Sequence, residues 1–156
     1  MNPIRVVSGT GTGPTATASY DAALADANVH NYNLVRVSSV VPPGATVERV
    51  GTAPDLGPVG ERLTVVEARA TAPGPCTPAA SLGWVQSDAG GVFYEADGES
   101  VAEVERTVCE GLAAGRELRG WDFGDERVET ATRSADAGCY ATAVVLAVYG
   151  DSDPLL

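Results

Sequence analysis

A short apolar stretch that runs directly into two prolines is the feature that most restricts how this chain can fold. Residues Leu34 to Val41 are rich in β-branched side chains and predict a strand. The strand must leave its sheet at Pro42 and Pro43, because proline cannot donate a ladder hydrogen bond. Just before this exit lie Ser38 and Ser39, whose hydroxyls at a strand end commonly bond to nearby backbone.

The charge and length of the chain restrict its class. Its 156 residues suffice for one domain with a buried core, and we expect a single domain, 1–156.

Ten basic and twenty-one acidic residues give a net charge of −11, and all ten cations are arginine. This balance argues against nucleic acid as a partner. Salt would screen the self-repulsion, so we expect a halophilic protein. Without a long apolar run or a signal-peptide pattern, we expect it to be cytoplasmic and free of membrane.

The residues that are missing exclude several cofactors. Pyridoxal phosphate enzymes hold their cofactor on a lysine, and the chain has none. A phosphate-binding loop also needs a lysine, so we interpret Gly9 to Pro14 as a flexible or tight-turning loop. With His30 as the sole histidine, a multi-histidine metal site cannot form within one chain, and we expect no metal. Cys76, Cys109 and Cys139 form no Cys-x-x-Cys pair and are expected to be buried thiols.

Capping signals and periodicity predict two helices. Ser19 is the expected N-cap of the first, with Asp21 in its first turn and Asn28 at its end. Ser100 and Glu103 form a capping box at the start of the second. The apolar residues that follow this box repeat at spacings of three and four, so one face of this helix should be buried.

Further strands surround these helices. We predict them at Ile4–Ser8, Arg62–Ala72, Ser81–Ser87, Val92–Ala96, Arg127–Thr132 and Cys139–Tyr149, with a loop-rich segment over Gly44–Gly60 and a loose tail from Asp151. Two helices cannot cover both faces of one large sheet, so strands must also pack on strands. The sequence therefore predicts an α+β fold with two packed sheets.

The stretch from Asn33 to Pro43 resembles the self-processing site of the pyruvoyl-dependent arginine decarboxylases. Upstream, Tyr20 to Asn28 resembles the aspartate-bearing helix of that family, and Gly91 to Gly98 resembles its strand with the catalytic glutamate. Arg119 to Trp121 and Gly138 to Tyr149 also fall where the family has similar segments. The resemblance therefore covers nearly the whole chain.

This resemblance implies a four-layer αββα sandwich and a homotrimer of cleaved protomers with active sites between neighbours. It implies that the bond between Ser38 and Ser39 is cut, which gives fragments 1–38 and 39–156 and turns Ser39 into a pyruvoyl group. It also implies that L-arginine is converted to agmatine and CO2 through a Schiff base on this group, which replaces pyridoxal phosphate. The segment from Ala72 to Trp84, with three prolines, departs from the family pattern.

Three further residues have roles that the resemblance implies. Glu95 matches the glutamate that donates a proton, a role that partial burial would support; otherwise it is a solvated residue at a hairpin end. Asp21 matches the aspartate that binds the guanidinium of arginine, and it is otherwise a helix charge. Asn33 matches an active-site asparagine, or else it is a capping residue. An uninterrupted strand would place Asn33 and Ser39 on one face. Arg36 would lie on the opposite face, where we expect it to pair with a carboxylate.

Two other functions remain open from the sequence. The first is a pyruvoyl-dependent decarboxylase of another amino acid. Asp21 distinguishes it from an arginine decarboxylase, because a carboxylate at this position binds favourably only to a substrate with a cationic side chain. The second is a non-catalytic oligomeric β-sandwich protein in which the bond between Ser38 and Ser39 stays intact.

Overall fold

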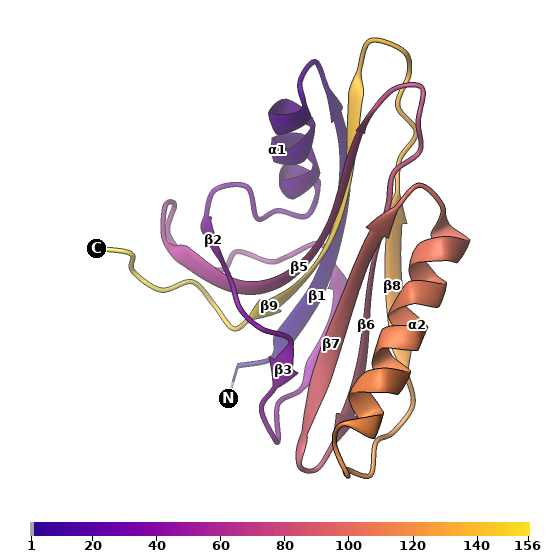
Figure 1. Ribbon diagram of the computed structural model, residues 1–156. Helices are drawn as coiled ribbons and strands as arrows, with labels where there is room; N and C mark the ends of the chain where they lie inside the picture. Colours follow the sequence, from indigo (N-terminus) through magenta and orange to yellow (C-terminus); the bar gives the residue numbers. More distant parts are fainter. Residues whose placement is uncertain (1) are drawn as a thin grey trace.

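The computed structural model describes residues 2–156, which form two β-sheets and two α-helices. The elements in chain order are β1 (Ile4–Gly13), α1 (Ala16–Asp26), β2 (Asn33–Arg36), β3 (Val40–Val41), β4 (Val47–Gly51), β5 (Arg62–Pro73), β6 (Ala79–Ser87), β7 (Gly90–Gly98), α2 (Val101–Glu117), β8 (Arg127–Thr132) and β9 (Tyr140–Tyr149). Strand order is β2-β5-β9-β1-β4 in one sheet and β3-β7-β6-β8 in the other. The sheets pack face to face, with α1 outside the first and α2 outside the second (Figure 1), which confirms the predicted α+β sandwich. Neither helix is long and apolar enough to cross a membrane.

Strand β9 is the centre of the larger sheet. It pairs antiparallel with β1 along its whole length and with β5 on its other side. Val145 and Ala147 face the second sheet, whereas Val144 and Leu146 face α1. Because both faces of β9 are buried, its sequence is almost continuously apolar instead of alternating.

Strand β1 continues through the glycine-rich segment that we predicted to be a loop, so that prediction was wrong. The glycines are needed because α1 lies directly on the strand. A Cβ atom added to Gly9 would stand 2.1 Å from the backbone oxygen of Ala23, and one added to Gly11 would stand 2.6 Å from the Ala23 nitrogen. The repeated glycine therefore serves close packing between helix and strand.

Replacing Gly9 by alanine should lower the free energy of unfolding by about 3 kcal/mol, because the added methyl collides with the α1 backbone and overpacking commonly costs about 1–3 kcal/mol. Gly120→Ala is the matched control, since a Cβ there meets no atom within 4 Å and should change stability by less than about 0.5 kcal/mol. Denaturant unfolding of both variants measures this difference. Equal stability of Gly9→Ala and the unaltered protein would contradict the close contact.

Helix α2 covers the second sheet as its periodicity predicts. Val108 and Leu112 are buried against Val85 and Val92 of the sheet. The side chain of Ser100 accepts a hydrogen bond from the backbone nitrogen of Glu103 at 3.1 Å, which confirms the predicted N-cap.

Helix α1 begins earlier than predicted. Thr15 is its N-cap and accepts a hydrogen bond from the Ala18 nitrogen at 3.0 Å. Ser19 is instead fully buried, and its hydroxyl lies 2.7 Å from that of Thr142. Asp21 accordingly lies beyond the first turn, which contains no acidic residue. The predicted end of the helix is confirmed, since Asn28 has a positive φ of 60° just after the cap.

The predicted strand from Leu34 to Val41 is in fact two strands in different sheets. Strand β2 pairs with β5 in the first sheet, and β3 pairs with β7 in the second. The Val37 nitrogen still donates to Val65 at 3.0 Å, whereas the Ser39 oxygen already accepts from Phe93 at 2.8 Å. The chain therefore changes sheets at Ser38, along the edge of the sandwich where β2 runs down to β3 in Figure 1.

One smaller prediction was incomplete and two others were wrong. The segment Gly44–Gly60 contains β4, which pairs in parallel with β1. The tail is not loose throughout, because the backbones of Asp153 and Arg62 exchange two hydrogen bonds of 2.9 and 3.0 Å. The thiols are not buried, since Cys76 is partly exposed and Cys109 and Cys139 are exposed.

Candidate active site

The two adjacent serines line a pocket of about 280 Å³ at the point where the chain changes sheets. The pocket, called the Ser39 pocket below, is formed by residues 38–40, residues 92–95 of β7, and Arg119. The Ser39 hydroxyl donates a hydrogen bond of 3.4 Å to Oε2 of Glu95. The structure thus brings together three of the residues selected from the sequence: Ser38, Ser39 and Glu95.

Hydrogen bonds hold the backbone around the serine pair. The Val40 N–H donates to the Ser38 carbonyl oxygen at 2.9 Å, so these residues form a tight turn centred on Ser39. The carbonyl of Val40 accepts a bond of 2.9 Å from the Tyr149 hydroxyl. Burial raises the pKa of Tyr149 to about 12, so this donor keeps its proton at neutral pH. The turn is therefore fixed before any chemistry takes place.

A cluster of polar side chains anchors the chain just before the serines. Arg36 donates through Nε to Glu67 at 3.0 Å and makes a second bond to the same carboxylate through Nη2. The side chain of Glu67 is only 1% exposed, and its other oxygen accepts a 2.6 Å bond from Tyr20 of α1. Burial, and then the bond to Glu67, raise the pKa of Tyr20 to about 12. The predicted pairing of Arg36 is confirmed, and it ties β2 to β5 and α1.

Glu95 is exposed in the single chain, although its proposed role favours partial burial. It lies on β7 two residues after Phe93, so it projects from the same face of the second sheet, where Phe93 is buried against the first sheet but Glu95 is exposed. One chain alone therefore does not supply the burial that we expected.

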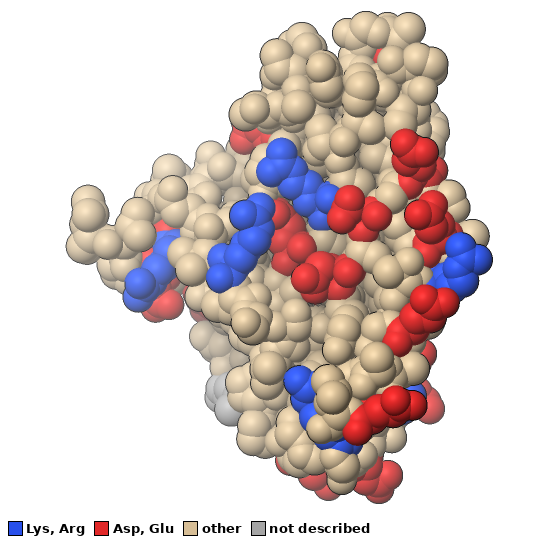
Figure 2. Space-filling model, in the orientation of Figure 1, with Lys and Arg blue, Asp and Glu red and all other residues tan. Residues whose placement is uncertain are grey.

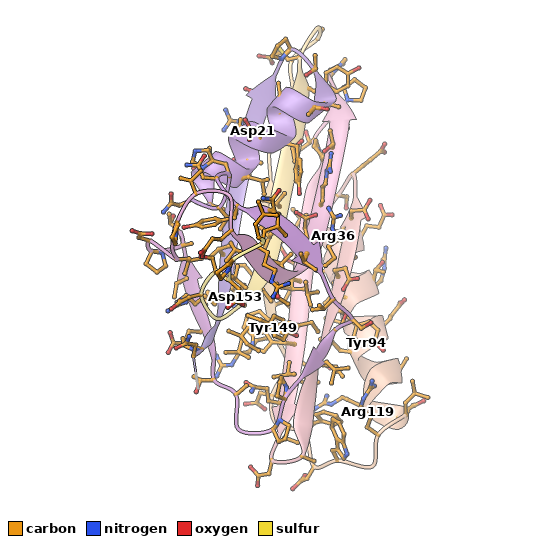
Figure 3. All side chains as sticks on the ribbon, turned by 90° about the vertical axis from the view of Figure 1, so that its left-hand side faces the viewer. Asp21, Arg36, Tyr94, Arg119, Tyr149 and Asp153 are labelled. Atoms are coloured by element: carbon orange, nitrogen blue, oxygen red, sulfur yellow. The ribbon has the colours of Figure 1, made fainter. Side chains whose placement is uncertain are left out.

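Asn33 and Asp21 do not line the Ser39 pocket of their own chain. Asn33 begins β2 and donates its amide to the Gly60 carbonyl at 2.8 Å. The prediction that it shares a face with Ser39 assumed an uninterrupted strand, which the structure does not have. Asp21 is exposed on α1, and Figure 3 shows it well apart from Tyr94 and Arg119.

Arg119 lines the pocket, although we predicted no role for it from the sequence. It follows the end of α2, and its guanidinium Nη1 donates to the Gly115 carbonyl at 3.0 Å. Arg119 is 24 positions from Glu95 in the chain. The two residues come together only because α2 packs against β7 and ends beside it. The one available signal was its place in a segment similar to one of the family.

Comparison with known proteins identifies the class. The profile of the family described as "Pyruvoyl-dependent arginine decarboxylase (PvlArgDC)" matches residues 3–154. A pyruvoyl-dependent arginine decarboxylase of Halobacterium salinarum is 55% identical, over 99% of this chain and 98% of its own. Those of Methanopyrus kandleri and Methanocaldococcus jannaschii are 33% and 31% identical, over 92% and 83% of this chain and 93% and 78% of their own.

The protein is thus an enzyme, a decarboxylase of the carboxy-lyase class. More particularly, the chain belongs to the pyruvoyl-dependent arginine decarboxylase family. The family predicted from the sequence is confirmed.

Proposed function

We propose that this enzyme converts L-arginine to agmatine and CO2 with a pyruvoyl group that it makes from its own Ser39. Membership of the family supports both the substrate and the cofactor. The structural observation that carries the assignment is the pocket in which Ser39 lies beside Glu95. In the proposed mature enzyme the bond between Ser38 and Ser39 is cut, which leaves fragments 1–38 and 39–156.

The residues around Ser39 fit the formation of this group. The Ser39 hydroxyl attacks the carbonyl carbon of Ser38, so that the backbone bond moves from nitrogen to oxygen as an ester. During this attack negative charge develops on the Ser38 oxygen, and the Val40 nitrogen lies 2.9 Å from it, within the range of about 2.7–3.1 Å for an oxyanion donor. Elimination next removes the α-proton of residue 39, breaks the bond between its Cβ and the ester oxygen, and releases the Ser38 carboxylate, which leaves dehydroalanine at position 39. Hydrolysis with loss of ammonia leaves the pyruvoyl group at position 39.

When formed, the pyruvoyl group supplies the electron sink for the loss of CO2. The carbon that loses CO2 then needs a proton, and we assign its delivery to Glu95, the carboxyl that lies 3.4 Å from the Ser39 hydroxyl oxygen. A neighbouring protomer that covers the pocket would give Glu95 the burial that one chain lacks.

We further propose that Asp21 and Asn33 complete the site of a neighbouring protomer in a homotrimer. Both side chains are exposed and lie outside the Ser39 pocket of their own chain. Val35, Val37 and Val40 are 42%, 40% and 50% exposed along the same segment, and a neighbour would cover this apolar strip. Asp21 would then bind the planar guanidinium of the substrate through two parallel hydrogen bonds.

Replacing Asp21 by alanine should raise KM for L-arginine about 10- to 100-fold, the usual worth of a charge-assisted hydrogen bond, and leave chain cleavage unchanged. Steady-state kinetics and an intact-mass spectrum measure the two effects. Glu110→Ala removes the same charge from an exposed position of α2 and should alter neither. An unchanged KM for Asp21→Ala would favour a substrate other than arginine.

A direct assay tests the proposed reaction. The purified protein is incubated in high salt with carboxyl-labelled L-arginine or L-lysine, and released CO2 and amine products are measured. We expect agmatine from arginine and far slower release from lysine, whose ammonium lacks the planar fork that a carboxylate binds. Faster turnover of lysine, or no turnover of arginine, would reject the proposed substrate.

A further inference from the structure

We infer that Arg119 binds the α-carboxylate of the amino acid substrate, which gives the Ser39 pocket a subsite for an anion. This inference rests on the proposed function, because it takes the substrate to be an α-amino acid that reacts at position 39. It adds to that function a second charged contact, at the opposite end of the substrate from Asp21.

Two contacts hold Arg119 in place without neutralising it. Nη1 donates to the Gly115 carbonyl, one of the carbonyls in the last turn of α2, at 3.0 Å. The guanidinium carbon lies 5.8 Å from the centre of the Trp121 ring, on its face. The side chain is partly buried and lines the pocket together with Ser39 and Glu95. A rigid cation is therefore already placed at the reacting end of the site.

Among residues 2–156, Arg119 is the one partly buried arginine without a carboxylate partner, because the other five arginines outside ion pairs are exposed. Four arginines of residues 2–156 form ion pairs with carboxylates: Arg5, Arg36, Arg49 and Arg116. Figure 2 shows arginine side chains lying directly beside acidic ones on that face of the molecule. Within the described part of the chain Arg119 forms no such pair, although acidic residues outnumber arginines by 21 to 10. A partly buried guanidinium without a carboxylate favours an anionic ligand.

The charges of L-arginine match this arrangement in one orientation only. Its α-amine must reach position 39, and its α-carboxylate is bonded to the same carbon, so the anion has to lie in the Ser39 pocket. The guanidinium at the far end would be repelled by Arg119 and attracted by Asp21. The planar fork of Arg119 can also bind a carboxylate through two hydrogen bonds.

The chemistry predicts which kinetic constant depends on Arg119. The carboxylate leaves as neutral CO2, so its pairing with a guanidinium is stronger in the bound substrate than in the transition state. Loss of Arg119 should therefore raise KM and leave kcat unchanged or higher. Agmatine has no carboxylate, so its affinity should not depend on Arg119.

The test compares KM for L-arginine with the inhibition constant of agmatine, measured by CO2 release on the cleaved enzyme. In Arg119→Gln we expect KM to rise about 10- to 100-fold while the agmatine constant changes less than about twofold. Arg119→Lys, which keeps a charge without the fork, should recover part of the loss. Arg106→Gln removes the same charge from an exposed position of α2 and should alter neither constant.

Several outcomes would overturn the inference. Equal weakening of both ligands would make Arg119 a structural residue, and an unchanged KM would leave it without a role in binding. If Arg119→Gln fails to cleave or fold, Arg119→Lys decides, because a raised KM with an unchanged agmatine constant supports the subsite and a parallel change rejects it. An unaltered enzyme that does not act on L-arginine would instead reject the proposed function itself.

Discussion

Replacing Ser39 by alanine is expected to leave the chain uncut and to abolish decarboxylation. Alanine has no hydroxyl to attack the Ser38 carbonyl, so neither the ester nor the pyruvoyl group can form. The fold should be unaffected, because Ser39 is held by its backbone carbonyl bond to Phe93 and its side chain makes only the 3.4 Å contact with Glu95. A denaturing gel should therefore show one band at 15.9 kDa.

Two neighbouring variants make this prediction specific. Ser38→Ala removes a hydroxyl one residue away but keeps the nucleophile, so the chain should still be cut. Ser39→Cys keeps a nucleophile at the right position and should be cut, at a different rate. Cleavage of Ser39→Ala, or loss of cleavage in Ser38→Ala alone, would place the nucleophile elsewhere.

The second large effect is expected for Glu95→Gln. Glutamine keeps the shape of the side chain but cannot give up a proton as a carboxyl does, so kcat should fall about 10²- to 10⁴-fold. The chain should still be cut, because the proposed role of Glu95 is to protonate the substrate after CO2 has left. Rate measurements with L-arginine, together with a mass spectrum of the same sample, separate the two steps.

Asp97→Asn is the matched control for Glu95→Gln. Asp97 lies two residues further along β7, is also exposed, and does not line the Ser39 pocket. Its replacement should leave kcat within about twofold, as is usual for a surface residue away from the chemistry. If Glu95→Gln keeps full activity, the proton comes from another group. If it instead blocks cleavage, Glu95 acts in processing.

Much of the fold could be predicted from local signals. The capping box at Ser100 and the regular apolar spacing after it predict α2 correctly. Its N-cap and its buried face both depend on residues that lie close together in the chain. Strand β9 is equally clear, since burial on both faces requires an apolar run. Such elements are predictable because neighbours in the chain supply their evidence.

The wrong predictions concern features set by distant partners. The composition of the glycine-rich part of β1 is typical of a loop, but these glycines in fact allow α1 to pack closely on the strand. The stretch around Ser38 has the composition of one strand, yet its two halves pair with β5 and β7. No residue near Ser39 in the chain indicates that Arg119 lines the same pocket.

The candidate site was predicted in part for the same reason. Ser38 and Ser39 are adjacent in sequence, and Glu95 enters their pocket because β3 pairs with β7. Asp21 and Asn33 remain outside that pocket, and their assignment depends on an assembly that a single chain does not contain.

The intact mass of the purified protein after denaturation tests the central claim most directly. Self-cleavage at Ser39 predicts two fragments, 1–38 and 39–156, the second with a blocked first residue. Their summed mass should exceed that of the uncut chain by one water less one ammonia, because hydrolysis of the intermediate adds water and releases ammonia. A single uncut chain of 15.9 kDa that persists after incubation in high salt would contradict the claim and remove the electron sink on which the proposed decarboxylation depends.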